Sequence, residues 1–196
     1  EISSAGTLSA SSTNSGAGDT TLAFALWPYA NRESEKYMGF AGYLTIPTGT
    51  YDSQRKLNAG DNRYKWALQA GYEQSIAKNT NWMTAVDALW FGENDDHAIT
   101  HKSLKQKALY SAQTAFIYKF NSTFTASAGY FYSLGGVTSL NGASQGDMTQ
   151  SHRYQISGVA TLPIGRLTLQ YGQEISTRSG LIEDSRWIVR YSKFFK

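Results

Sequence analysis

The sequence contains no cysteine, no long hydrophobic run and no cluster of basic residues. The absence of cysteine excludes disulfide scaffolds and thiolate metal sites. The longest apolar stretch, from Leu22 to Ala30, has nine residues and contains a proline, whereas a membrane-spanning helix needs about 18 apolar residues. Helical membrane proteins are therefore excluded. The 18 Lys and Arg residues are scattered among 15 Asp and Glu, which argues against nucleic acid as a partner.

Aromatic residues are plentiful. The chain has 13 Tyr, 9 Phe and 5 Trp, although its hydrophobic content is an ordinary 41% and its mean hydropathy is −0.41. This mixture suits a fold with an aromatic exterior and a polar interior. Because composition does not shift along the 196 residues, we expect a single domain over residues 1–196, opening with a Ser, Gly and Ala-rich loop over residues 1–18. The chain starts with Glu1 and shows no signal segment, so we expect a processed or truncated product.

The stretch from Lys36 to Asp52, KYMGFAGYLTIPTGTYD, shows a pattern that recurs along the chain. The even positions from Met38 to Ile46 are Met, Phe, Gly, Leu and Ile, whereas the odd positions before and between them are Tyr, Gly, Ala, Tyr and Thr. A period of two with one apolar face predicts a β-strand. Pro47 ends this strand because proline cannot donate to a central ladder, and a polar loop to Asn62 follows.

Nine such segments predict nine antiparallel strands, at residues 19–29, 37–46, 63–76, 82–91, 104–120, 124–134, 153–162, 167–174 and 186–192. Most of these segments have about 10 to 14 residues, which exceeds the roughly 5 to 6 of soluble sheets and matches the roughly 9 to 11 of tilted membrane strands. Short turns alternate with longer connections, a rhythm typical of outer-membrane barrels. The short turns lie at 31–35, 78–81, 121–123 and 163–165, and the long connections at 48–62, 93–103, 135–151 and 176–183.

Aromatic residues are predicted at both ends of the strands if the short turns face the periplasm, as in the two girdles of membrane barrels. The external group is Trp66, Trp90, Tyr130, Tyr132, Tyr154 and Trp187. The periplasmic group is Trp82, Tyr118, Phe120, Phe124 and Tyr191. The chain also ends on Phe194-Phe195, which resembles the aromatic C-terminus of outer-membrane barrels, although Lys196 follows it.

The predicted fold is therefore all-β, a transmembrane antiparallel up-and-down β-barrel. Bacterial barrels have an even strand number, yet nine strands are visible and the first runs downward from an external loop. Either Glu1 to Leu8 supplies a tenth strand or further strands precede this chain. We expect the second, because residues 1–18 are poor in apolar side chains. A soluble β-sandwich is the alternative, since aromatic residues favour strands in any sheet.

Charged and amide side chains gather on the face opposite the apolar one, where we expect them to line the lumen. The candidates are Lys65, Gln69, Glu73, Asp87, Gln113, Arg153, Gln155, Gln170, Glu174, Arg186 and Arg190. Any water-filled or plugged barrel is polar inside, so these residues could equally be structural. Pairing across the loop at 176–183 places Glu174 opposite Arg186. The same pairing places Gln170 opposite Arg190, so that lumen charges are satisfied across strands.

Several short motifs resemble, in their order, the outer-membrane family named for the meta-pathway of phenol degradation. They are Gly18-Asp19-Thr20, the run YLTIPTGTYD from Tyr43 to Asp52, the run NAGDNR from Asn58 to Arg63, Leu134-Gly135-Gly136 with Asn141-Gly142, and Arg153-Tyr154 leading to Leu162-Pro163. The resemblance covers most of the chain from Gly18 onward. It implies a barrel of about a dozen strands that admits small, rather hydrophobic molecules.

The expected function is passive uptake of small, hydrophobic or aromatic molecules through a channel in the bacterial outer membrane, with outer-membrane lipid or detergent around it. A plugged structural barrel and a barrel-borne hydrolase are the alternatives within this fold. For a hydrolase, His152 lacks a serine and an acid at recognisable positions. Asp95-Asp96-His97 and His101 are residue types that bind metals, but a solvated external loop explains them more simply. No cofactor, metal or nucleic acid is therefore expected.

Overall fold

The computed structural model describes residues 15–55, 57–179 and 182–193. Most of the expected N-terminal loop and the terminal pair Phe194-Phe195 lie outside the described residues. All thirteen elements in the described ranges are strands. No helix in this part of the chain is long and apolar enough to cross a membrane.

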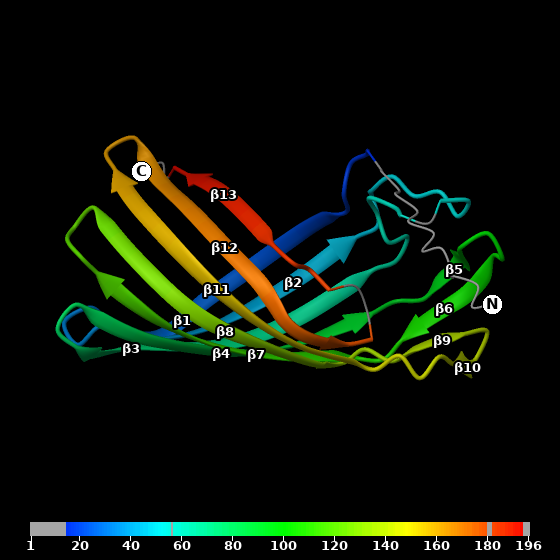
Figure 1. Cartoon of the computed structure of the whole chain (residues 1–196), viewed down its shortest axis with the longest axis horizontal. Helices are drawn as coiled ribbons and strands as arrows, with labels where there is room; N and C mark the ends of the chain where they lie inside the picture. The colour runs from blue at the N-terminus through cyan, green and yellow to red at the C-terminus, as the bar shows by residue number, and fades with distance from the viewer. Residues whose placement is uncertain (1–14, 56, 180–181, 194–196) are drawn as a thin grey trace, which may run out of the picture.

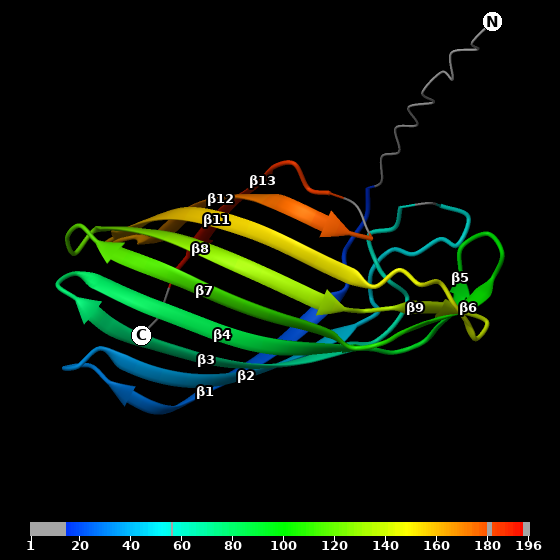
Figure 2. The same ribbon diagram turned by 60° about the horizontal axis from the view of Figure 1, so that its bottom comes forward.

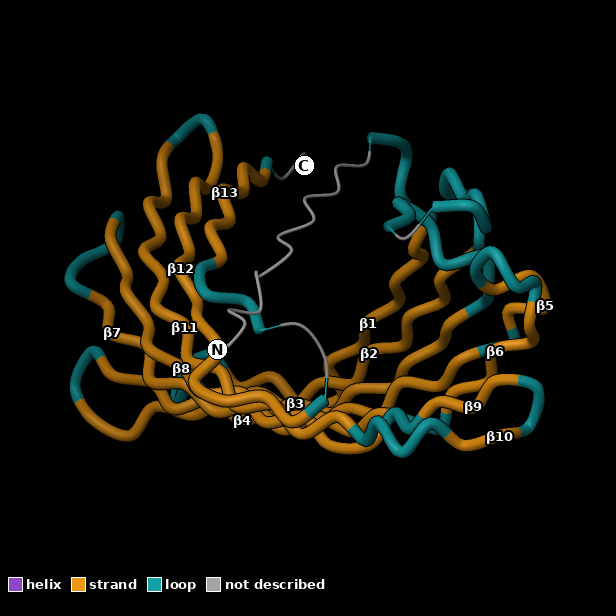
Figure 3. The backbone as a smooth tube through the Cα atoms, turned by 45° about the vertical axis from the view of Figure 1, so that its right-hand side comes forward, coloured by secondary structure: helices purple, strands orange, loops and turns teal. Residues whose placement is uncertain are grey.

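Nine strands form one antiparallel sheet and follow each other across it in chain order (Figure 1). They are β1 (Thr20–Asn31), β2 (Lys36–Ile46), β3 (Lys65–Ala77), β4 (Thr80–Phe91), β7 (Leu109–Lys119), β8 (Phe124–Gly135), β11 (Thr149–Leu162), β12 (Gly165–Arg178) and β13 (Arg186–Ser192). All nine predicted strands are present in an up-and-down order. The sheet curls round an open interior (Figure 3), and within the described ranges β1 and β13 are not paired with each other.

Short turns join the strands in pairs at one end of the sheet, at the left of Figure 1. In the turn after β1, Asn31 Oδ1 accepts the backbone N–H groups of Glu33 and Ser34, each at 3.0 Å. Asn121 plays the same part in the turn between β7 and β8. Asparagine favours such turns because its side chain bonds the backbone two or three residues on. The longer connections lie at the other end, so the predicted alternation of turn lengths is confirmed.

The register of the strands shows which residues share a face. Leu68 lies opposite Ala88, and its neighbour Gln69 lies opposite Asp87. Because successive side chains point to opposite faces, we call the face of Leu68 the outer face and that of Gln69 the inner face. On the outer face Leu68 is 62% exposed, whereas Ala85 on the concave inner face is 7% exposed. An apolar outer band that continues across the sheet is suited to lipid rather than to water.

Aromatic residues lie at both ends of the outer face, as predicted. At the loop end Trp66 and Trp90 lie directly opposite each other on β3 and β4. At the turn end the rings of Tyr118 and Phe120 meet edge to face, with centroids 4.9 Å apart. Amphipathic rings at these two levels correspond to the interfacial girdles of membrane barrels.

The first strand departs from simple alternation at Trp27-Pro28. These two residues together face Gly39, because the register shifts between Leu26 and Tyr29. Such a bulge is one of the few places where a sheet accepts proline. Trp27 follows Ala23 and Ala25 on the inner face, and the bulge moves the next odd-numbered residue, Tyr29, to the outer face. A Cβ added to Gly39 would lie 3.1 Å from the Cδ1 and Nε1 atoms of the Trp27 indole. Glycine at position 39 therefore permits this close approach.

The long connections contain a second, four-stranded sheet at the loop end (Figure 2). Its strands are β5 (Asn94–His97), β6 (Lys102–Gln106), β9 (Thr138–Leu140) and β10 (Ala143–Ser144). The prediction of irregular loops at 93–103 and 135–151 is therefore wrong in part. The predicted strand at 104–120 begins too early, since β6 belongs to the second sheet and β7 begins at Leu109. Backbone groups of long loops need hydrogen-bond partners. Pairing among β5, β6, β9 and β10 supplies these partners.

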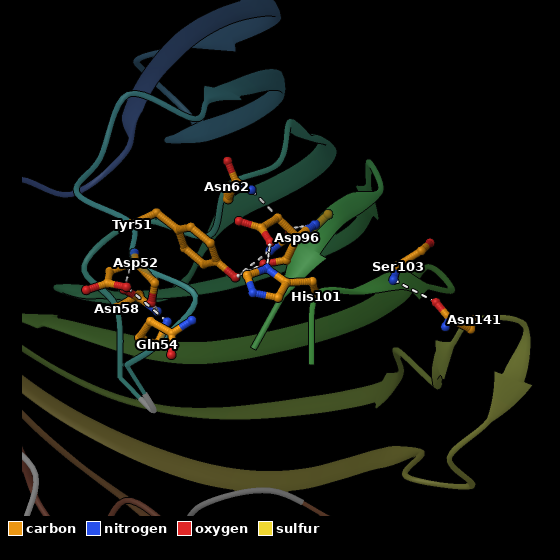
Figure 4. Close-up of polar contacts among 10 residues, drawn as sticks. Tyr51, Asp52, Gln54, Asn58, Asn62, Asp96, His101, Ser103 and Asn141 are labelled. Atoms are coloured by element: carbon orange, nitrogen blue, oxygen red, sulfur yellow. Dashed lines mark hydrogen bonds and ion pairs between the residues drawn. The ribbon is translucent and has the colours of Figure 1, made fainter. Parts of the chain in front are cut away.

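Asn94 ties this second sheet to the loop that follows β2. Its side chain is 1% exposed and its Nδ2 donates to Asp61 O at 3.1 Å and to Tyr51 Oη at 3.2 Å. Its Oδ1 accepts Asn62 Nδ2 at 3.0 Å, and the Tyr51 hydroxyl donates to Asp96 O at 2.8 Å. Figure 4 shows Tyr51, Asn62 and Asp96 gathered at this junction. The loop after β2 is thus held by specific hydrogen bonds.

Two neighbouring substitutions in β3 should have unequal effects on stability. Leu68→Arg places a charge at mid-strand on the outer face and should lower the free energy of unfolding in a bilayer by about 2 to 4 kcal/mol. Gln69→Arg places the same side chain on the inner face and should change it by at most about 1 kcal/mol. Urea unfolding in lipid vesicles, followed by tryptophan fluorescence, measures both. Equal losses would contradict the assignment of the faces.

Candidate functional site

The inner face brings together all of the polar residues predicted to line the lumen. By register, this face carries Lys65, Gln69, Glu73, Asp87, Gln113, Arg153, Gln155, Gln170, Glu174, Arg186 and Arg190. The prediction of a shared face follows from the period of two. Along the strands the inner face has three zones: a loop-end zone, a central zone and a turn-end zone. Each zone is defined by contacts among these residues and others that the prediction omitted.

The predicted pairing of β12 with β13 is wrong by two residues. Arg186 lies opposite Gly172, and Arg190 lies opposite Thr168. The face is unchanged, because a shift of two residues keeps each side chain on its side. Glu174 is instead bound by its own hairpin loop: its Oε2 accepts the N–H of Glu183 and the hydroxyl of Thr177, each at 3.0 Å. These bonds satisfy the Glu174 carboxylate, which the predicted pairing had placed opposite Arg186.

The loop-end zone centres on Arg63, which the sequence prediction missed. Arg63 is 9% exposed, its Nη2 donates to Gln106 Oε1 at 2.7 Å, and its guanidinium carbon lies 4.7 Å from the centre of the Phe91 ring. Its Nε and Nη1 atoms have no hydrogen-bond partner among the described residues. Burial lowers the pKa of Arg63, although the nearby Asp61 carboxylate acts in the opposite direction. Arg63 shares odd numbering with Lys65, the signal that could have placed it on this face.

The turn-end zone is built from two linked pairs. Lys119 Nζ lies 2.7 and 2.8 Å from the carboxylate oxygens of Glu35, which joins the first turn to the end of β7. Asn81, 1% exposed, donates through Nδ2 to Glu73 Oε1 at 2.8 Å. Opposite charges and an amide donor thus satisfy the carboxylates of this zone. Of these four residues, the sequence prediction included Glu73 as a candidate.

The central zone contains a groove of about 260 Å³. Small residues form its floor, and larger side chains rise around it. The small residues are Ala25, Gly39, Ala41, Gly71 and Ala85, and the larger inner-face residues are Trp27, Tyr37, Tyr43, Gln69, Glu73, Met83 and Gln113. The prediction found Gln69, Glu73 and Gln113 but missed Trp27, because only charged and amide side chains were considered for the lining. The alternation of Leu22, Phe24 and Leu26 on the outer face was the sequence signal that could have placed Trp27 on the inner one.

The residues considered for metal binding and hydrolysis do not form such sites in the described part of the chain. The Asp96 carboxylate contacts His101 Nδ1, but no three or more His, Asp, Glu or Cys side chains there could share a metal. His152 lies on the outer face, where its Nδ1 hydrogen-bonds the Tyr130 hydroxyl and its ring contacts the Tyr132 ring in a tilted arrangement with centroids 4.8 Å apart. Its nearest partners are therefore tyrosines rather than a serine and an acid.

The Glu35–Lys119 pair makes stability depend on pH. Through its hydrogen bond and its charge, Lys119 holds the pKa of Glu35 below its ordinary value of 4.5, although burial acts the other way. A lowered folded-state pKa adds stability that is present above 4.5 and is lost as the pH falls through the folded-state value. Glu35→Gln should therefore lower the unfolding free energy near neutral pH by roughly 0.2 to 1 kcal/mol, because the pair is partly exposed.

Urea midpoints of the Glu35→Gln and unaltered proteins, measured from neutral to acidic pH, should converge as the pH drops below 4.5. Glu33→Gln is the matched control, since Glu33 lies in the same turn and forms none of the ion pairs found in the described ranges. A difference that stays constant with pH, or that Glu33→Gln reproduces, would show that the ion pair is not the cause.

Comparisons with known proteins agree with this geometry. The family model described as "Putative MetA-pathway of phenol degradation" matches residues 1–189. No curated protein matches the chain significantly. The chain is similar to the crystal structure of an outer membrane channel from Pseudomonas putida F1, at 29% sequence identity and a TM-score of 0.87, and the match covers 91% of this chain and 67% of that one. The curved sheet therefore has the fold of an outer-membrane barrel, and the soluble β-sandwich is excluded.

Proposed function

Because the chain belongs to the family of the MetA-pathway of phenol degradation, we propose that it is a channel for passive uptake of small hydrophobic or aromatic molecules across the bacterial outer membrane. The similarity to an outer membrane channel supports both the location and the activity. The observation that carries the proposal is the opposite character of the two faces of one continuous sheet. The outer face is apolar and exposed, and the inner face holds the charged and amide side chains.

The inner face offers a path that suits uncharged solutes. Ion pairs lie towards its ends, with Lys65 paired to Asp61 at 2.8 Å near the loops and Lys119 paired to Glu35 near the turns. The central groove between them is lined mainly by glycine, alanine, aromatic and amide residues. Ions feel the potential of the charged zones, whereas a small neutral molecule crosses them without an electrostatic barrier. We assign the eleven inner-face residues to the lining of this path.

Conductance in planar lipid bilayers tests the channel directly. Purified protein inserted into a bilayer should give discrete current steps, together with faster swelling of vesicles in phenol than in a sugar of larger size. Insertion without current steps would favour a plugged structural barrel. Turnover of a lipid or ester substrate would favour a barrel-borne hydrolase.

Arg190→Glu should shift ion selectivity towards cations, because it reverses a charge on the inner face. Arg190 lies opposite Thr168, so its replacement does not remove a cross-strand partner of opposite charge. Reversal potentials in a salt gradient measure the shift. Lys36→Glu changes the net charge by the same amount on the outer face at the turn end and should leave selectivity unaltered. Equal shifts in the two variants would show that total charge, and not the lining, sets selectivity.

A further inference from the structure

We propose that the central groove beside Trp27 binds a flat, uncharged aromatic molecule that carries one hydrogen-bonding group, such as a simple phenol. The inference rests on the proposed channel function, to which it adds a specific binding site and a ligand class. Its basis is the combination, in one place on the inner face, of a floor of small residues, an exposed indole and amide groups with donors available to a ligand.

The floor of the groove is a row of very small residues at one level of the sheet. Gly39 of β2 lies opposite Gly71 of β3, Gly71 lies opposite Ala85 of β4, and Ala85 lies opposite Gln113 of β7. Three strands therefore cross this level with at most one methyl group each. The groove volume of about 260 Å³ exceeds the roughly 150 Å³ of an engineered cavity that accommodates benzene. One aromatic ring fits on this floor.

Trp27 stands at one end of the row. Its side chain is 64% exposed on the inner face, and its indole approaches the Gly39 position closely. The indole therefore presents an aromatic surface at the edge of the groove. Aromatic rings attract a second flat ring by offset stacking or edge contact. A planar ligand on the glycine floor has the indole as its neighbour.

Amide groups supply the polar contact. Gln113 closes the other end of the row, and its side-chain amide has no hydrogen-bond partner among the described residues. Gln69 Oε1 accepts the Tyr43 hydroxyl at 3.3 Å, which leaves its amide N–H groups available. A ligand hydroxyl can bond these groups as donor or acceptor. One hydroxyl on an aromatic ring matches this arrangement.

Charge selects against anionic ligands. Among the described residues that line the groove, Glu73 is the one that carries a charge, and its Oε1 is already bonded to Asn81. A carboxylate placed beside it would be repelled without a cation in the lining to compensate. Neutral aromatic molecules are therefore favoured over aromatic acids such as benzoate.

Calorimetric titration of phenol into the full protein in detergent micelles tests the site. Trp27→Ala removes the stacking partner and should weaken phenol binding by about 2- to 12-fold. Gly71→Val fills the floor and should weaken it by a similar factor, while the fold is kept, because a Cβ at Gly71 meets Ala85 Cβ at an ordinary 3.6 Å. Gly42→Val makes the same change on the outer face, where a Cβ would meet Leu68 Cδ2 at 3.7 Å, and should leave binding unaltered.

A second measurement avoids reliance on these variants. In a protein whose sole tryptophan is Trp27, phenol should change the fluorescence saturably. In the matched protein whose sole tryptophan is Trp66, on the outer face, phenol should give only the non-saturating change expected from partition into the micelle. The two proteins share the other tryptophan-to-phenylalanine replacements.

Three results would overturn the inference: cyclohexanol binding as tightly as phenol, benzoate or benzylammonium binding more tightly, or equal losses for Gly71→Val and Gly42→Val. Conductance recorded on the same samples separates this site from the channel. Normal current steps with no phenol binding would refute the site alone. Phenol binding that depends on Trp27 and Gly71 without any current would support the site and refute the channel.

Discussion

A strand that crosses hydrocarbon must bond every backbone N–H and C=O group to a neighbouring strand. This requirement sets most of what is seen in this protein. Continuous pairing from β1 to β13 fixes the register, and the register, with its period of two, sends Leu68 to one face and Gln69 to the other. The apolar outer face and the polar inner face are consequences of the same ladder. Departures from the ladder are few, and the bulge at Trp27-Pro28 shifts the alternation of β1 between Leu26 and Tyr29.

The inner face is graded along the strands rather than uniformly polar. Buried or paired charges lie at its ends, as Arg63 beside Gln106 and Lys119 with Glu35 show. At these levels polar loops and turns can solvate or pair the charges. The centre is lined mainly by glycine, alanine, aromatic and amide residues, although Glu73 lines it and Asp87 lies opposite its Gln69. Ions that pass along this face meet an electrostatic potential that varies with position, whereas small neutral rings meet a surface of small and aromatic residues. This combination is expected of a pore for weakly polar solutes.

The sequence predicted the nine strands, their faces and the position of the aromatic girdles, because each depends on local alternation. It failed where the determinant was not local. The pairing of β12 with β13 depends on how the loop folds round Glu174, and the second sheet depends on contacts between loops distant in sequence. Trp27 was missed because only charged and amide side chains were considered for the lining, although alternation from Leu22, Phe24 and Leu26 places it on the inner face. Arg63 was missed as a lining residue, although the predicted strand at 63–76 included it and its parity placed it on the inner face.

The alternation of the two faces can be measured directly because the protein contains no cysteine of its own. Single cysteines introduced in turn at residues 65–73 of β3 can be tested, in lipid vesicles, with a charged, membrane-impermeant thiol reagent. The odd positions, from Lys65 to Glu73, should react through the aqueous lumen. The even positions, among them Leu68 and Ala70, should be protected by lipid. Uniform reactivity, or protection of the odd positions, would contradict a lipid-facing outer face and a water-lined interior.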